Sequence, residues 1–104
     1  MGKRDKIHTL ARLIALAVAH RIGVLLDAHS TYANKYRKEY ANFIRQAENT
    51  QWGEHWSSSD KEEILETAKK ESLKELTMRT YLASEKFKLL EKELLYVLKE
   101  LRIL

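Results

Sequence analysis

Histidines are the side chains of this chain best suited to chemistry, and there are four: His8, His20, His29 and His55. Imidazole is the commonest metal ligand in proteins and serves as an acid or base near neutral pH. On a helix, His20 and Asp27 would share one face, with His29 close by. The sequence has neither the H-E-x-x-H nor the E-x-x-H spacing of helical metal centres. We therefore expect no metal, no other cofactor and no catalytic residues.

Basic and aromatic residues are interleaved between positions 32 and 45, a combination that binds nucleic acids through phosphate contacts and base stacking. The basic residues are Lys35, Arg37, Lys38 and Arg45, and the aromatic residues are Tyr32, Tyr36, Tyr40 and Phe43. On a helix the aromatic residues share one face at steps of about four, and the basic residues lie mainly off it. We therefore interpret the aromatic residues as core and the basic residues as solvated.

The charge of the chain is uneven, although 19 Lys and Arg against 15 Asp and Glu give a net charge of only +4. Residues 1–50 hold nine basic and four acidic side chains, whereas residues 59–104 hold ten of each. An anionic partner would therefore meet the first half. Cysteine is absent, which excludes disulfides and Cys-ligated zinc. Because Arg12 interrupts the first apolar run, we expect no signal peptide and no membrane span, and a cytoplasmic location by default.

The first half has the pattern of one long helix, since proline is absent and Gly23 is the one glycine between residues 3 and 50. Apolar and aromatic residues recur at a mean step of 3.6, interrupted only by His29. They are Ala11, Ile14, Val18, Ile22, Leu25, Tyr32, Tyr36, Tyr40, Phe43 and Ala47. We predict a helix over residues 4–50, with a break near residues 29–31 as the alternative. Its apolar character on nearly all sides from residue 10 to residue 26 is typical of a central element.

The second half carries a heptad repeat, which is typical of a long helix packed on another in a coiled-coil-like contact. The repeat consists of Leu73, Leu76, Thr80, Ala83, Phe87, Leu90, Leu94, Val97, Leu101 and Leu104. Ser59 and Glu62 have the spacing of a capping box, which marks the start of a helix. We therefore predict a second helix over residues 59–104.

The turn between the two predicted helices covers residues 51–58 and holds Trp52, His55 and Trp56. Two tryptophans on a short polar loop suit a recognition site. We favour a different role, in which these aromatic residues fold back and plug the open end of the helical bundle.

The apolar surface of these two helices exceeds what one helical hairpin can bury. The second helix carries an apolar row at steps of seven beside its seam residue Leu90, and the first carries a ridge of small residues that permits close helix approach. The row consists of Leu82, Leu89, Tyr96 and Ile103, and the ridge of Ala11, Ala15, Ala19 and Gly23. We therefore expect an antiparallel hairpin that forms a four-helix-bundle homodimer through these nine residues.

From these patterns we expect a single all-helical domain over residues 1–104 that acts as a structural or protein-interaction module without enzymatic activity. Self-association is the expected mode of action. The alternative function is a nucleic-acid-binding accessory protein that uses the four basic residues between positions 35 and 45.

Overall fold

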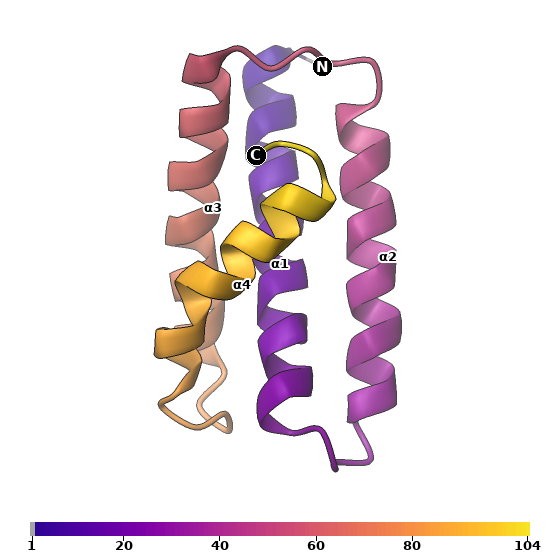
Figure 1. The fold of residues 1–104 in the computed structure, drawn as a ribbon, viewed down its shortest axis with the longest axis vertical. Coiled ribbons are helices and arrows are strands. Elements are labelled where there is room, and N and C mark those ends of the chain that lie inside the picture. Colours follow the sequence, from indigo (N-terminus) through magenta and orange to yellow (C-terminus); the bar gives the residue numbers. More distant parts are fainter. Residues whose placement is uncertain (1) are drawn as a thin grey trace.

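Four α-helices make up the chain in the computed structural model, which describes residues 2–104 (Figure 1). They are α1 (Lys3–Leu26), α2 (Ala33–Gln51), α3 (Ser58–Met78) and α4 (Lys86–Glu100). The described part of the chain contains no strand, so the prediction of an all-helical fold is confirmed. The prediction of two long helices is wrong, because each of them is divided in two.

The first division, between α1 and α2, confirms the alternative of a break near residues 29–31. At the end of α1 the Asp27 backbone N–H donates to the Gly23 carbonyl (3.0 Å). In the loop that follows, the Ser30 hydroxyl accepts a hydrogen bond from the Tyr32 N–H (3.0 Å). Asp, Ser and Thr side chains compete for backbone groups in this way, which favours turns over helix.

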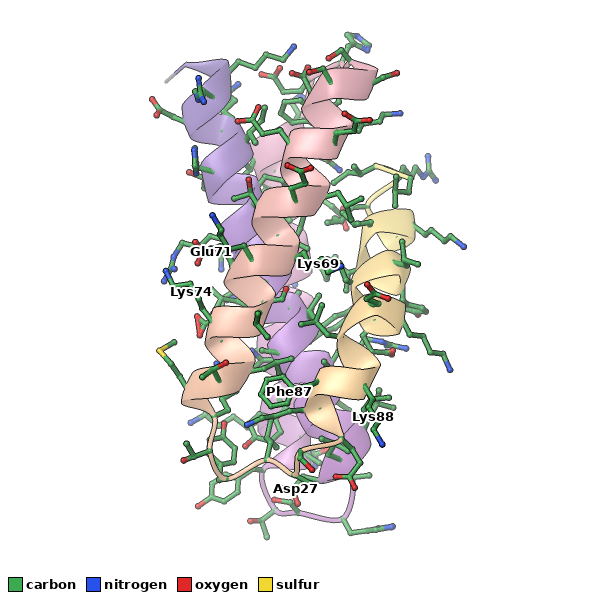
Figure 2. All side chains as sticks on the ribbon, turned by 90° about the vertical axis from the view of Figure 1, so that its left-hand side faces the viewer. Asp27, Lys69, Glu71, Lys74, Phe87 and Lys88 are labelled. Atoms are coloured by element: carbon green, nitrogen blue, oxygen red, sulfur yellow. The ribbon has the colours of Figure 1, made fainter. Side chains whose placement is uncertain are left out.

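The second division, between α3 and α4, was not predicted from the sequence. The Lys86 ammonium at the start of α4 donates to the Arg79 carbonyl just after α3 (2.7 Å), and Leu82 in the loop is buried. A lysine that bonds a carbonyl at a helix end stabilises that end. The predicted heptad seam is therefore interrupted: Leu73 and Phe87 are 49% and 43% exposed, and Figure 2 shows Phe87 between the lower parts of α3 and α4.

The capping box of α3 lies two residues before the predicted one. The Ser57 hydroxyl accepts from the Asp60 N–H, and the Asp60 carboxylate accepts from the Ser57 N–H, both at 3.0 Å. The prediction of Ser59 with Glu62 was wrong because aspartate reaches back as glutamate does at this spacing. The pKa of the Asp60 carboxyl is lowered, mainly by the nearby Lys3 ammonium (2.8 Å) and to a smaller extent by the hydrogen bond from the Ser57 N–H.

Helix α1 is the centre of the fold, as its apolar character on all sides predicted. It packs against α2, α3 and α4, whereas the backbone of α2 runs close to that of α1 alone. Figure 1 shows α2 and α3 on opposite sides of α1, with α4 crossing α1 obliquely. Leu10, Ile14, Val18 and Ile22 are fully buried in α1. Burial of each such side chain contributes about 1.5–3 kcal/mol relative to exposure, so α1 organises the core.

Helix α1 is also long and apolar enough, by length and composition, to cross a membrane, and it is the one such helix among the described residues. An 18-residue window of α1 has a mean hydropathy of 1.7 although Arg12 interrupts the apolar run. In the fold, 56% of the window is buried inside the protein, which is the situation of a core helix.

Candidate functional site

The ridge of small residues on α1 lies inside the chain. Ala11, Ala15, Ala19 and Gly23 are all buried by other parts of the same chain. A Cβ added at Gly23 would lie 3.4 Å from the Tyr36 ring, so the close neighbour of the ridge at this point is α2. These four residues therefore have no surface free for a second copy, because the neighbour that we expected from another chain is supplied by this one.

The five remaining interface candidates are divided between the core and the surface. Leu82, Leu90 and Ile103 are buried within the chain, because the break before α4 lets this segment fold back onto α1 and α3. Leu89 is half-buried, and Tyr96 is 48% exposed. Only these two of the nine candidates reach the surface, and both line the same groove.

The groove consists of two adjoining hollows beside the C-terminal half of α1, and we call it the Arg21 groove. The smaller hollow, ≈230 Å³, is lined by Arg21, Val24, Leu25, Arg37 and Tyr40. The larger, ≈610 Å³, is lined by Arg21, Leu25, Leu89, Lys92, Glu93, Leu95, Tyr96 and Lys99. The lining comes from α1, α2 and α4, and α4 crosses α1 obliquely (Figure 1).

Arg21 lies where the two hollows meet and connects α1 to α4. Its Nε donates to Oε1 of Glu93 at 2.9 Å, and its guanidinium carbon lies 3.6 Å from the centre of the Tyr96 ring. Glu93 and Tyr96 are three residues apart and thus on one face of α4. The Glu93 side chain is only 5% exposed, so its charge depends on Arg21 for compensation. This arrangement holds the floor of the groove in one geometry.

At its upper end the groove is closed by contacts between α2 and the end of α4. The Tyr40 hydroxyl donates to the Glu100 carboxylate, and Nε2 of Gln51 donates to the Leu101 carbonyl (2.7 Å). Burial raises the pKa of Tyr40, and the hydrogen bond to Glu100 raises it further. Tyr40 therefore remains a hydrogen-bond donor over the whole neutral range.

The rim of the groove is positively charged. Arg37 projects from α2, and Lys92 and Lys99 project from α4; all three residues are exposed. Within residues 2–104, none of these three side chains forms an ion pair, and Arg37 donates only to the neutral Asn34 side chain (3.1 Å). Since Glu93 is already paired with Arg21, the lining carries three uncompensated positive charges.

The nucleic-acid candidates on α2 are arranged as the helical pattern indicated. Lys35, Arg37, Lys38 and Arg45 are exposed, and Lys35 lies 4.0 Å from the Glu39 carboxylate. The aromatic residues are mostly turned toward α1: Tyr40 and Phe43 pack against the core, and Tyr36 contacts Gly23. Tyr32 alone is well exposed, at 61%. Tyr32 is therefore the one ring of this set that is open for a base to stack on.

The histidines do not form a metal centre, since no group of three or more potential ligands occurs in the described residues. His20 is 9% exposed and lies against the rings of Tyr36 and Phe43. Its Nδ1 contacts the Leu16 carbonyl at 2.7 Å and its Nε2 contacts the Glu39 carboxylate at 2.5 Å. Both ring nitrogens are thus occupied within the chain.

The two tryptophans of the loop between α2 and α3 have different environments. Trp56 is half-buried, packs against the core and donates from its indole to the Gln51 side chain (3.1 Å), which is the folded-back position expected for it. Trp52 is 85% exposed, and for this residue the same prediction was wrong. His55 is exposed and, with both tryptophans, lines an open hollow of ≈650 Å³.

Sequence reasoning selected Leu89 and Tyr96 but missed Arg21, Glu93 and Leu25 as parts of one site. Arg21 and Glu93 are 72 residues apart, and no periodicity within either helix indicates that they meet. A search of family models, of curated proteins and of solved structures found nothing that matches this chain.

Proposed function

We propose that this chain is a protein-interaction module that binds the apolar face of a partner's helix in the Arg21 groove. The observation that carries the proposal is the clustering of Leu25, Leu95 and Tyr96, which are 49%, 43% and 48% exposed, around a hollow beside the central helix. Single exposed apolar residues are normal on protein surfaces. Several gathered around a concave surface are typical of an interaction site.

A helix suits this groove because of the neighbouring elements. The groove is lined by the last turns of α1, by α2 and, over residues 89–99, by α4, so one more helix could lie alongside α4 there. Helices pack 8–10 Å apart by placing side chains of one into the groove of another. An amphipathic helix enters such a groove with apolar residues at steps of three and four.

The groove is also preorganised for binding by contacts within the free chain. The ion pair of Arg21 with Glu93 and its stacking on Tyr96 hold α4 against α1. The contact of Tyr40 with Glu100 holds α2 near the end of α4. A surface that is already ordered loses less conformational entropy when it binds, which favours affinity.

The two functions expected from the sequence receive less support. Of the residues that argued for a homodimer, Leu82, Leu90 and Ile103 are buried within one chain. Nucleic-acid binding through α2 would have only the exposed ring of Tyr32 for base stacking. Self-association gives a distinct outcome in the experiment that tests the proposal.

The test uses a synthetic 18-residue helical peptide with leucines at positions i, i+3, i+4 and i+7 and glutamine elsewhere. We expect its addition to shift the backbone amide NMR signals of Arg21, Leu25, Leu89 and Tyr96. Leu25→Glu should abolish these shifts because it places a charge in the apolar hollow. Leu73→Glu is the matched control: Leu73 is equally exposed, at 49%, but lies on α3 outside the groove.

Two results would contradict the proposal. One is an absence of peptide-induced shifts in the groove, or equal loss of binding in the Leu25 and Leu73 variants. The other is a wild-type dimer, detected by light scattering after gel filtration, that is broken by Leu25→Glu. The second result would assign the groove to self-association.

A further inference from the structure

We infer that the partner helix carries acidic residues on both flanks of its apolar stripe, so that the Arg21 groove is specific for acidic amphipathic helices. This inference rests on the proposed function and deepens it. Its basis is the charge of the rim, where Lys92, Lys99 and Arg37 surround apolar Leu25 without an acidic partner among residues 2–104. Complementary charge around an apolar centre gives an interface its specificity and orientation.

The spacing of the two lysines predicts the spacing of the acids. Lys92 and Lys99 are seven residues apart on α4, which places them on the same side of the helix, about 10 Å apart along its axis. A helix that lies beside α4 meets both with acids that are also seven residues apart. Arg37, on the opposite wall formed by α2, meets an acid on the other flank. The expected partner therefore has an apolar stripe between two acidic edges.

The charge of Arg21 does not take part in this recognition. Its guanidinium is already paired with Glu93 at 2.9 Å and lies against Tyr96. Arg21 therefore forms part of the floor of the groove with its charge neutralised by Glu93. The charges that select the partner are those of Arg37, Lys92 and Lys99 on the rim. Removal of the rim charges should therefore change selectivity and leave the fold intact, because exposed charges contribute little to stability.

The same rim argues against two other occupants. A second copy of the chain in a two-fold contact would place the same positively charged rim against itself, which is repulsive. A nucleic acid would match the charge, but one face of the Tyr96 ring is already covered by Arg21, and Tyr40, the other ring of the lining, is half-buried and bonded to Glu100. Base stacking requires open aromatic faces.

The experiment compares three 18-residue peptides with the same leucine stripe, whose flanking positions are all Glu, all Gln or all Lys. Binding to the full chain is measured by fluorescence anisotropy of labelled peptide. Exposed ion pairs are individually weak, so we expect the Glu peptide to bind about 5–30 times more tightly than the Gln peptide, and the Lys peptide to bind most weakly. The preference should decrease as salt is raised, because screening weakens exposed charges.

Variants then assign the preference to the rim. Lys92→Gln combined with Lys99→Gln should remove most of the preference for Glu over Gln while the Gln peptide binds as before. Lys70→Gln combined with Lys74→Gln is the control, since it removes the same charge from α3 and neither residue lines the groove. Figure 2 shows Lys74 on the side of α3 that faces away from α4. The preference should survive in this control.

The outcomes separate this inference from the proposed function. If the Gln peptide binds in the groove but the Glu peptide binds no more tightly, the inference of an acidic partner helix is wrong and the proposed function stands. If no peptide binds, both are wrong. Displacement of the Glu peptide by a single-stranded oligonucleotide at equal concentration, with loss of oligonucleotide binding in the Lys92 and Lys99 variant, would overturn the inference in favour of nucleic acid.

Discussion

Replacement of Arg21 by methionine tests whether the buried carboxylate of Glu93 holds α4 on α1. Methionine keeps an unbranched side chain of similar length and removes the guanidinium. Because the Glu93 side chain is 5% exposed and Arg21 is its one hydrogen-bond partner within residues 2–104, the variant leaves a buried charge without compensation. Breaking a fully buried pair costs about 3–5 kcal/mol. Since the Arg21 side chain is 28% exposed, water reaches the site, and we expect a loss of about 2–3 kcal/mol.

Glu93→Leu and the variant that combines it with Arg21→Met complete a double-mutant cycle. Glu93→Leu should cost less than Arg21→Met, because the Arg21 head group lies nearer to solvent and keeps its stacking on Tyr96. The variant with both changes should be close to wild type, since no charge then remains buried. Double-mutant cycles isolate the pair when each single change removes only that interaction, so the coupling free energy should be at least about 2–3 kcal/mol, the sum of the two single costs.

The assay is guanidinium denaturation at neutral pH, followed by far-UV circular dichroism, with the free energy of unfolding taken from linear extrapolation. A cost below about 0.5 kcal/mol for Arg21→Met would refute the reasoning, because that value is typical of exposed ion pairs. The pair would then be solvated, and the floor of the groove would not be fixed by it.

Further expectations concern single positions, each measured by the same denaturation assay. The Ser72 hydroxyl is buried without a hydrogen-bond partner in the described residues, so Ser72→Ala should raise the free energy of unfolding by about 1 kcal/mol; a loss would show that the hydroxyl is satisfied. Arg102 has φ = 60°, so Arg102→Gly should stabilise by about 1 kcal/mol, and no gain would argue against this left-handed conformation. Gly23→Ala should gain about 0.5–1 kcal/mol, since its Cβ would meet Tyr36 at an ordinary 3.4 Å; a loss would indicate overpacking. Above pH 10, wild type should lose stability that Tyr40→Phe retains: the raised pKa of Tyr40 keeps the folded state protonated while the unfolded state ionises near its ordinary 10.0, and parallel pH profiles would contradict this.

The helical content and the central position of α1 were predictable, because both follow from properties of contiguous sequence. Absence of proline and the apolar character of α1 on all sides determine them. The break before α2 was open to prediction from Ser30, whose hydroxyl competes for backbone hydrogen bonds. The break before α4 was not, because it depends on the contact of Lys86 with the Arg79 carbonyl and on burial of Leu82, which arise only in the folded chain.

The candidate site was predictable only in part for the same reason. The surplus apolar row on the second half contains Leu89 and Tyr96, which do line the groove. The row was assigned to a second chain because a continuous helix cannot fold back on itself. Lys92 and Lys99 belong to a segment with balanced charge, so only the pairing of Glu93 with Arg21 leaves them uncompensated. No pattern in the local sequence predicts that Arg21 and Glu93 pair.

The central position of α1 has a consequence for biosynthesis. Helix α1 is made first among the four helices, yet the contacts that cover it come from all the others, and Glu93 follows Arg21 by 72 residues. At about 5–20 residues per second, translation takes roughly 4–14 seconds to supply that partner. During this interval Leu10, Ile14 and Val18 have no complete cover. The most apolar helix of the chain is therefore the one whose burial is completed last, which leaves it prone to aggregation in the meantime.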